Sequence, residues 1–301
     1  MNYRTLGRTG LRVSELGFGA LEIGRNWPYW RKEMQDFLRP TESEAIRVLD
    51  MAVDLGINFF DTAPAYFKSE EILGKAFKRK RNSVFIATKC GEWFDGERSV
   101  YDYSAAETLK FIESSLRLLQ TDHIDLLQIH SASPDVVRSG ETLGAMKKAR
   151  KDGKVRFLGI STDQVEAARL AIESSEYDSI QVTYNVLQPE FSREIFPLAE
   201  KEKVGVIIKG GLGAGELTSK FTDIPENQKR EKIASLKRLA DKNEVSIQEI
   251  ALRFALSHPT VSTLIAGTKN PAHLKSNCEA SLKGALDTSL MEQLSLSLHS
   301  E

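Results

Sequence analysis

The 301-residue chain has little cysteine and no excess of charge of one sign. Its two cysteines, Cys90 and Cys278, lie far apart and outside any Cys-x-x-Cys spacing, so they give no disulfide framework and are typical of a reducing compartment. The formal net charge is −1, and the 41 basic and 42 acidic residues are interspersed. Because no charged block stands out, we expect a small neutral or weakly charged ligand rather than nucleic acid or an anionic membrane.

Long hydrophobic runs and the signatures of several enzyme classes are also missing. No run approaches the roughly 18 apolar residues of a membrane span, and the N-terminus is polar, so we expect a cytoplasmic protein. No Gly-x-Ser-x-Gly elbow of a serine hydrolase occurs. The glycine-rich runs at 17–24 and 211–216 carry Glu where a Rossmann fingerprint has its last Gly. The five histidines show no metal-ligand spacing, so no metal site is expected.

Short β-branched apolar runs alternate with amphipathic segments along the whole chain. This rhythm is typical of βαβ units, and near-continuous apolar strands indicate a parallel sheet covered on both faces. We predict strands at 13–20, 57–60, 83–89, 124–130, 155–161, 179–185, 204–210 and 262–268. We predict helices at 69–78, 104–119, 140–151 and 163–173, and a capping box, Thr41 with Glu44, before an apolar helical face at 45–53.

Both a doubly wound sheet and a closed barrel fit this pattern. The chain has no linker or composition break, and its units recur every roughly 25 to 45 residues, which favours the barrel. We therefore predict an α/β fold: one (β/α)8 TIM barrel over residues 1–301, with an N-terminal β-hairpin and extended loops on the C-terminal face. The long connection at 24–40 either packs its own aromatic residues or forms a substrate-facing wall.

Four ionisable residues, Asp61, Tyr66, Lys89 and His130, follow or end three successive predicted strands. In a barrel these strand ends meet at one mouth. Each residue alone could be an ordinary packing or solvated side chain, but a buried strand that ends in Lys or His needs a reason for its polar group. The coincidence of four such positions predicts a site.

This set of side chains can polarise and protonate a carbonyl group. A tyrosine hydroxyl, with a pKa of about 10, is a weak acid unless an ammonium such as that of Lys89 stabilises its phenolate. Asp61 would keep Lys89 charged inside the site. A neutral His130 could donate a hydrogen bond to the substrate oxygen. The set has no electron source of its own, so a cofactor must supply the hydride.

Five segments resemble the aldo-keto reductase family: DTAPAYFKSEEILGKAF (61–77), TKCG (88–91), LLQIH (126–130), GIS (159–161) and IAGTKNPAHLKSN (265–277). They occur in the family's order, and the similarity spans essentially the whole chain. The resemblance implies that Asp61, Tyr66, Lys89 and His130 are the catalytic tetrad, with Tyr66 as the general acid in reduction.

The same resemblance implies a nicotinamide cofactor. Ser161 and Gln181 match positions that hold the carboxamide, and Asn185 is a weaker candidate nearby. The implied cofactor residues are Ser161, Thr162, Gln181, Lys209, Gly210, Gly211, Leu212, Gly213, Gly215, Gly267, Thr268, Lys269, His273 and Asn277. Lys269 with Thr268 would suit a 2′-phosphate, and residues 266–278 contain no Asp or Glu that would repel it, so we expect NADPH rather than NADH. The alternative is that Lys269 is an ordinary solvated lysine.

The chain departs from the family's common pattern at three positions. Lys209 stands where many members have an aromatic residue that stacks on the nicotinamide, so either its aliphatic stem covers the ring or another residue does. Gly211 replaces a frequent proline, and Thr162 replaces a common asparagine. Cys90, beside Lys89, is either a redox-sensitive thiol with a lowered pKa or a buried inert one.

The resulting expectation is an NADPH-dependent reductase of small aldehydes or ketones. Two alternatives stay open: a dehydrogenase of a sugar or secondary alcohol, and a nucleotide-binding sensor or channel-associated subunit, against which the intact tetrad argues. Trp27, Trp30, Trp93 and Phe94 predict an apolar-walled substrate pocket. The sequence identifies neither the substrate nor the oligomeric state.

Overall fold

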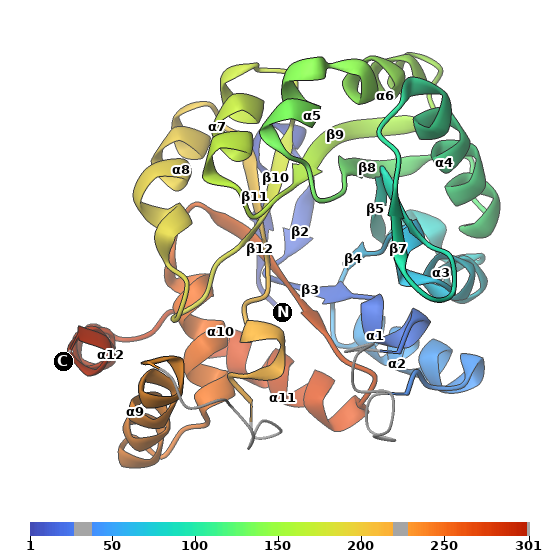
Figure 1. The fold of residues 1–301 in the computed structure, drawn as a ribbon. Coiled ribbons are helices and arrows are strands. Elements are labelled where there is room, and N and C mark those ends of the chain that lie inside the picture. Colours follow the sequence, from blue (N-terminus) through green and yellow to red (C-terminus); the bar gives the residue numbers. More distant parts are fainter. Residues whose placement is uncertain (27–37, 219–227, 300–301) are drawn as a thin grey trace.

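Eight parallel strands close into a barrel in the computed structural model, which describes residues 1–26, 38–218 and 228–299 (Figure 1). The order around the barrel is β10-β11-β12-β3-β4-β5-β8-β9. These strands are β3 (Leu16–Gly19), β4 (Phe59–Asp61), β5 (Phe85–Cys90), β8 (Ile124–Ile129), β9 (Val155–Ser161), β10 (Ser179–Thr183), β11 (Gly205–Lys209) and β12 (Val261–Gly267). Each predicted strand has a counterpart within two residues or so, except the first, and the predicted barrel is confirmed.

The first predicted strand, 13–20, is two strands. Its start belongs to β2 (Arg12–Ser14), which pairs antiparallel with β1 (Tyr3–Thr5), and its end is the barrel strand β3. The break falls at Ser14 and Glu15, two polar residues that are buried and that the sequence analysis took as part of one strand. The β1–β2 hairpin confirms the predicted N-terminal hairpin. Its connection and second strand place apolar side chains in the barrel interior, in a cluster of Leu6, Leu11, Val13, Phe59, Ala87, Leu126 and Ile207.

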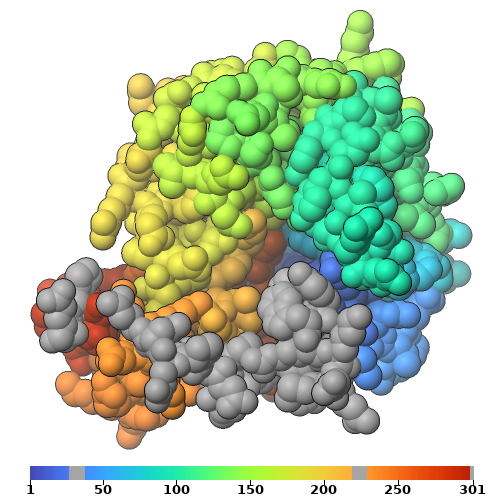
Figure 2. Space-filling model, viewed as in Figure 1, coloured from blue at the N-terminus to red at the C-terminus, as the bar shows by residue number. Residues whose placement is uncertain are grey.

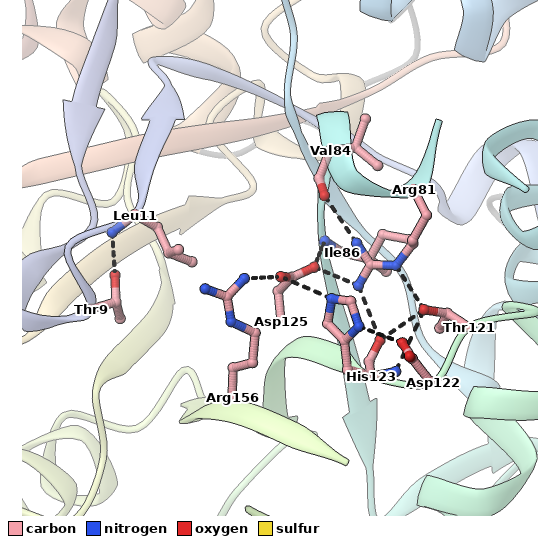
Figure 3. Close-up of polar contacts among 10 residues, drawn as sticks. All are labelled: Thr9, Leu11, Arg81, Val84, Ile86, Thr121, Asp122, His123, Asp125 and Arg156. Carbon is pink, nitrogen blue, oxygen red and sulfur yellow. Dashed lines mark hydrogen bonds and ion pairs between the residues drawn. The ribbon is translucent and has the colours of Figure 1, made fainter. Parts of the chain in front are cut away.

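A buried carboxylate ties the strands together near the start of β8 (Figure 3). Asp125 accepts hydrogen bonds from Arg81 (Nη2, 2.6 Å), Arg156 (Nη1, 2.9 Å) and the backbone N–H of Ile86 (3.0 Å). Asp125 lies near the amino end of β8, whereas His130 follows its carboxyl end. This ionic cluster therefore lies at the end of the barrel away from the tetrad, and its partners satisfy the buried charge.

Helices lie around the outside of the strands (Figure 1). They are α2 (Glu42–Asp54), α3 (Ser69–Phe77), α4 (Ala105–Leu118), α6 (Glu141–Lys151), α7 (Val165–Glu173), α8 (Glu190–Lys201), α10 (Ile247–Ser257) and α11 (Pro271–Leu282), with shorter α1 (Leu21–Gly24) and α5 (Pro134–Ser139). The predicted capping box is confirmed, because Thr41 N donates to Glu44 Oε2 (2.9 Å) and Glu44 N to Thr41 Oγ1 (3.4 Å). Within the described ranges, no helix combines the length and apolar character that crossing a membrane requires.

Two additions to the barrel shape its carboxyl face. A short hairpin, β6 (Glu92–Phe94) and β7 (Ser99–Tyr101), follows β5, and β6 packs against the 3₁₀ turn η3 (Pro64–Tyr66). Helices α9 (Gln228–Lys242) and α12 (Thr288–His299) pack together beside α10. Their apolar cluster includes Leu217, which anchors the segment after β11. Three-residue strands are too short for a period-2 pattern, so the sequence analysis missed the hairpin.

Candidate active site

Asp61, Tyr66 and Lys89 meet at the carboxyl end of the barrel. Asp61 ends β4, Tyr66 ends η3, and Lys89 lies near the end of β5. The Lys89 Nζ lies 2.6 Å from Asp61 Oδ2, 3.0 Å from the carbonyl oxygen of Thr62 and 3.2 Å from the Tyr66 hydroxyl. The ammonium thus joins a buried carboxylate to a phenol, as the predicted proton-donor system requires.

His130 follows β8 and lies beside Tyr66. The two rings meet edge to face, with their centroids 5.8 Å apart. The Tyr103 hydroxyl donates to the His130 carbonyl oxygen (2.9 Å), which fixes this part of the backbone. The structure therefore brings all four predicted tetrad residues into one site.

A fifth ionisable residue, Glu92, lies in this site and was missed in the sequence analysis. Its Oε2 is 3.0 Å from His130 Nδ1, although outside the direction of a ring N–H hydrogen bond, and it accepts a bond from Ser131 Oγ (3.2 Å). The chain reaches Glu92 through a turn at Gly91, which has a φ of 95°. The available signal was an acidic residue three positions beyond the end of the strand predicted at 83–89.

Burial dominates the protonation of the tetrad. It lowers the pKa of Lys89 below its ordinary value, and the Asp61 carboxylate opposes that shift. Burial raises the pKa of the Tyr66 hydroxyl well above 10, and the carboxylates of Asp61 and Glu92 raise it further. The positive charge of Arg25 lowers this pKa, but burial and the two carboxylates outweigh it. Tyr66 is therefore protonated at neutral pH, the state in which it can give a proton to an oxygen.

The imidazole of His130 is neutral at pH 7. Burial lowers its pKa well below 6.5, and the positive charges of Lys89 and Lys209 lower it further. A neutral imidazole carries one ring N–H, so it can donate a hydrogen bond without carrying a charge. This agrees with the orienting role expected for His130.

Two glutamines hold the other oxygen of Asp61. Gln181 Nε2 donates to Asp61 Oδ1 at 2.7 Å and Gln128 Nε2 at 3.1 Å. Ser161 Oγ in turn donates to Gln181 Oε1 (3.1 Å). Ser161 and Gln181, implied to hold the carboxamide, thus lie directly behind the tetrad. Gln128 was missed in the sequence analysis, although it lies two residues before His130, where strand alternation predicts a shared face.

A cavity of about 490 Å³ extends from Asp61 and Tyr66 to α11. In Figure 2 the same face is hollowed between the teal segment that holds β6 and β7 and the yellow and orange segments. Nine implied cofactor residues line the cavity: Lys209, Gly210, Gly211, Leu212, Gly215, Gly267, Thr268, His273 and Asn277. Ser161, Thr162, Gln181, Gly213 and Lys269 are not among its lining residues.

The cavity walls suit a ligand that carries phosphates. A Cβ added to Gly211 would lie 2.6 Å from Leu264 Cδ1, so a larger residue there would displace the Leu264 side chain. Gly213 has a φ of 58° and Gly215 a φ of 98°, which turns the backbone beside the cavity. At the far end, α11 begins at Pro271, and helix N-termini favour anions. These residues fit a nicotinamide dinucleotide that extends from the tetrad to α11.

The charged side chains of this region have their own partners. Lys209 Nζ lies 3.1 Å from Asp163 Oδ2, and the Lys269 ammonium donates to the carbonyl oxygen of Leu38. Glu22 also lines the cavity. The sequence analysis considered acidic residues only within 266–278, and Glu22 reaches the cleft from the other end of the chain. Within the described residues, no group of three or more His, Cys, Asp or Glu side chains could hold a metal ion.

The predicted substrate aromatics have different surroundings. Trp27 and Trp30 lie outside the described residues. Trp93 packs on Phe111 of α4, with centroids 5.7 Å apart. Phe94 meets the ring of Phe67 edge to face at 6.0 Å and lies 3.7 Å from the guanidinium carbon of Arg25.

Cys90 is a buried thiol. Its side chain has no solvent exposure, and burial raises its pKa to about 12. Of the two interpretations, the structure therefore favours the inert thiol.

Comparison with known proteins gives a consistent match. The model of the "Aldo/keto reductase family" matches residues 15–296. The chain is 30% identical to L-galactose dehydrogenase of Arabidopsis thaliana, over 92% of this chain and 87% of the relative. It is 26% identical to the NADH-specific methylglyoxal reductase of Escherichia coli, over 97% of this chain and 98% of the relative. The holo form of aldo-keto reductase AKR11C1 from Bacillus halodurans superposes with a TM-score of 0.85 at 29% identity, covering 99% of this chain and 96% of that one.

Proposed function

Since the chain belongs to the aldo/keto reductase family, oxidoreductases that act on carbonyls or alcohols with a nicotinamide cofactor, we propose that it reduces small aldehydes or ketones with NADPH. Tyr66 is the proton donor in this proposal. The observation that carries it is the contact of Lys89 with both Asp61 and Tyr66 at one end of the cleft.

Each tetrad residue has a distinct task in this reaction. The bound cofactor supplies a hydride to the carbonyl carbon. Tyr66 gives its hydroxyl proton to the carbonyl oxygen, and Lys89 stabilises the phenolate that remains. Asp61 keeps the ammonium in place, since it accepts from Lys89 at 2.6 Å. Neutral His130 orients the carbonyl oxygen.

The preference for NADPH rests on the α11 end of the cavity. Thr268 and His273 line it, and the N-terminus of α11 adds a partial positive charge suited to a 2′-phosphate. Glu22 lines the same cavity, and one relative is NADH-specific, so both cofactors belong in the assay.

For the substrate, we propose that Phe94 and Phe67 flank the carbonyl compound, with Trp27, Trp30 and Trp93 as further wall candidates. Phe67 directly follows Tyr66 in the chain, and 44% of its surface is exposed. Its φ of 56° is unusual for a bulky residue, and such strained residues cluster at functional sites. An apolar, partly open rim suits aromatic or aliphatic carbonyls.

Oxidation of a sugar or secondary alcohol is the second candidate. The similarity to L-galactose dehydrogenase favours it, and the tetrad serves both directions of the same reaction.

The two candidates are separated by kinetics in both directions. NADPH and NADH oxidation is followed with a panel of aromatic and aliphatic aldehydes and ketones, and NADP⁺ and NAD⁺ reduction with sugars and secondary alcohols. The proposal predicts the highest kcat/KM for a carbonyl with NADPH. A higher value for an alcohol supports the second candidate, and binding of cofactor without turnover on either panel contradicts both.

A further inference from the structure

Lys209 forms an ion pair in the wall of the cleft. It ends β11, and its Nζ lies 3.1 Å from Oδ2 of Asp163, which follows β9. Thr183, at the end of β10, donates to the other carboxylate oxygen of Asp163 at 2.7 Å. All three residues line the cavity that Asp61 and Tyr66 also line. Thr183 and Lys209 are register partners at the carboxyl ends of β10 and β11, so the pair stands on the carboxyl face of the barrel, in the wall of this cavity.

The two charges of this pair act unequally on the interior. The Lys209 side chain is 25% exposed and the Asp163 side chain 61%, so water screens the carboxylate more than the ammonium. The charge of Lys209 reaches the tetrad, because it contributes to the lowered pKa of His130. The electrostatic potential that the pair produces at the tetrad is therefore positive, although the two formal charges of the pair cancel.

Under the proposed function, on which the inference rests, the reactive ring of the cofactor would lie at the Tyr66 end of the cavity that Lys209 also lines. Hydride must pass to a carbon whose oxygen lies at the Tyr66 hydroxyl, so the nicotinamide ring lies within contact distance of the substrate at that end. The ring carries a positive charge when oxidised and none when reduced. An ammonium beside it repels the oxidised form and leaves the reduced form unaffected.

We propose that Lys209 makes the site bind reduced cofactor in preference to oxidised cofactor, and that Asp163 limits this preference. An uncharged aromatic residue at this position would lack the effect. During carbonyl reduction the ammonium favours capture of NADPH and release of NADP⁺. Lys209 is thus a specificity residue for the redox state of the cofactor.

The test is the ratio of two dissociation constants, Kd(NADP⁺)/Kd(NADPH), measured by isothermal titration calorimetry. Lys209→Met keeps the aliphatic stem and removes the charge, so the ratio falls about threefold to tenfold. Asp163→Asn removes the neutralising charge, so the ratio rises. Lys209→Arg keeps the charge and leaves the ratio within about twofold of wild type.

Matched controls come from the outer surface. Lys147 of α6 pairs with Glu176 at 2.9 Å, so Lys147→Met and Glu176→Gln make the same charge changes far from the cleft and leave the ratio unchanged. Adenosine 2′,5′-bisphosphate lacks the nicotinamide, and its affinity stays the same in Lys209→Met.

Two results overturn the inference while the proposed function stands. In the first, Lys209→Met weakens the binding of NADP⁺ and NADPH by the same factor, which would mean that Lys209 contacts a part of the cofactor that does not change with its redox state. In the second, Lys209→Met and Asp163→Asn shift the ratio in the same direction. If wild type binds neither NADP(H) nor NAD(H), the proposed function fails and the inference with it. If the protein binds NAD⁺ and NADH more tightly than NADP⁺ and NADPH, the same ratio and the same variants are measured with NAD⁺ and NADH.

Discussion

The ammonium of Lys89 lies 2.6 Å from the carboxylate of Asp61, with 0% and 1% of the two side chains exposed. Asp61→Asn leaves this ammonium without a counterion and turns an amide N–H toward either Lys89 or the two glutamine donors. We expect a loss of about 3–5 kcal/mol in the free energy of unfolding. Urea denaturation measures it.

The double variant Asp61→Asn with Lys89→Met provides the internal check. It removes both charges, so we expect it to lose less stability than the sum of the two single variants. The exposed pair Lys147–Glu176 is the control, and its double variant changes stability by less than about 1 kcal/mol. Additive losses at Asp61 and Lys89 would mean that the buried pair is not energetically coupled.

We predict that Glu92 affects the pH dependence of activity on the alkaline side. Its charge helps to raise the pKa of Tyr66, so Glu92→Gln lowers that pKa. Because the protonated phenol is the donor in reduction, the alkaline fall of kcat/KM moves to lower pH in this variant. Glu97→Gln, between β6 and β7 on the exposed part of the same hairpin, leaves the profile in place. If the alkaline fall of kcat/KM occurs at the same pH in Glu92→Gln as in wild type, Glu92 has no electrostatic role in the reaction.

The buried carboxyl of Glu70 makes the stability of the fold fall as the pH rises above the ordinary pKa of a carboxyl group. Burial raises its pKa, although Thr88 Oγ1 donates to it at 2.6 Å. A group whose folded pKa is raised costs stability as the pH rises from its unfolded pKa through its folded one. Glu70→Gln therefore gains stability over wild type across that window, measured by urea denaturation at a series of pH values.

The neighbouring residue is a contrasting control for Glu70. Glu71 has its pKa lowered, by hydrogen bonds from Lys75 and Lys68, so Glu71→Gln gains no stability as the pH rises. Equal behaviour of the two variants would argue against burial as the cause.

Gly24 leaves room for the segment that carries Tyr66. A Cβ on Gly24 would lie 2.3 Å from the Tyr66 carbonyl oxygen and 2.5 Å from Ser69 Cβ. Gly24→Ala must displace this backbone, so we expect a loss of about 1–3 kcal/mol in stability and a lower kcat. Gly144→Ala in α6, where nothing lies within 4 Å of the new Cβ, is the control and should keep wild-type kcat. Normal activity in Gly24→Ala would show that the Tyr66 segment tolerates displacement.

The fold and the tetrad could be predicted from the sequence because their signals are local and repeated. Buried parallel strands leave long apolar runs, and a barrel gathers their carboxyl ends, so Asp61, Lys89 and His130 could be placed together without coordinates. The break between β2 and β3 was missed because Ser14 and Glu15, the polar residues at the break, are buried like the strand residues around them.

The rest of the site depends on contacts between distant parts of the chain. Glu22 reaches the cleft from the first connection. Asp163 meets Lys209, which lies 46 positions later in the chain, and no local pattern encodes this pairing. The sequence analysis considered only the effect of a neighbouring ammonium on Tyr66, whereas burial, which the sequence does not quantify, raises the pKa of its hydroxyl.

The Tyr66 hydroxyl is the centre of the proposed chemistry, and removing it is the most direct test. Tyr66→Phe is compared with wild type in NADPH-dependent reduction of the best carbonyl substrate. The control is Tyr177→Phe, since the buried Tyr177 hydroxyl has no hydrogen-bond partner among the described residues. We predict a fall of about 100-fold or more in kcat/KM for Tyr66→Phe with unchanged NADPH affinity, and near wild-type rates for Tyr177→Phe. A Tyr66→Phe variant that reduces the substrate as fast as wild type would contradict the proposal.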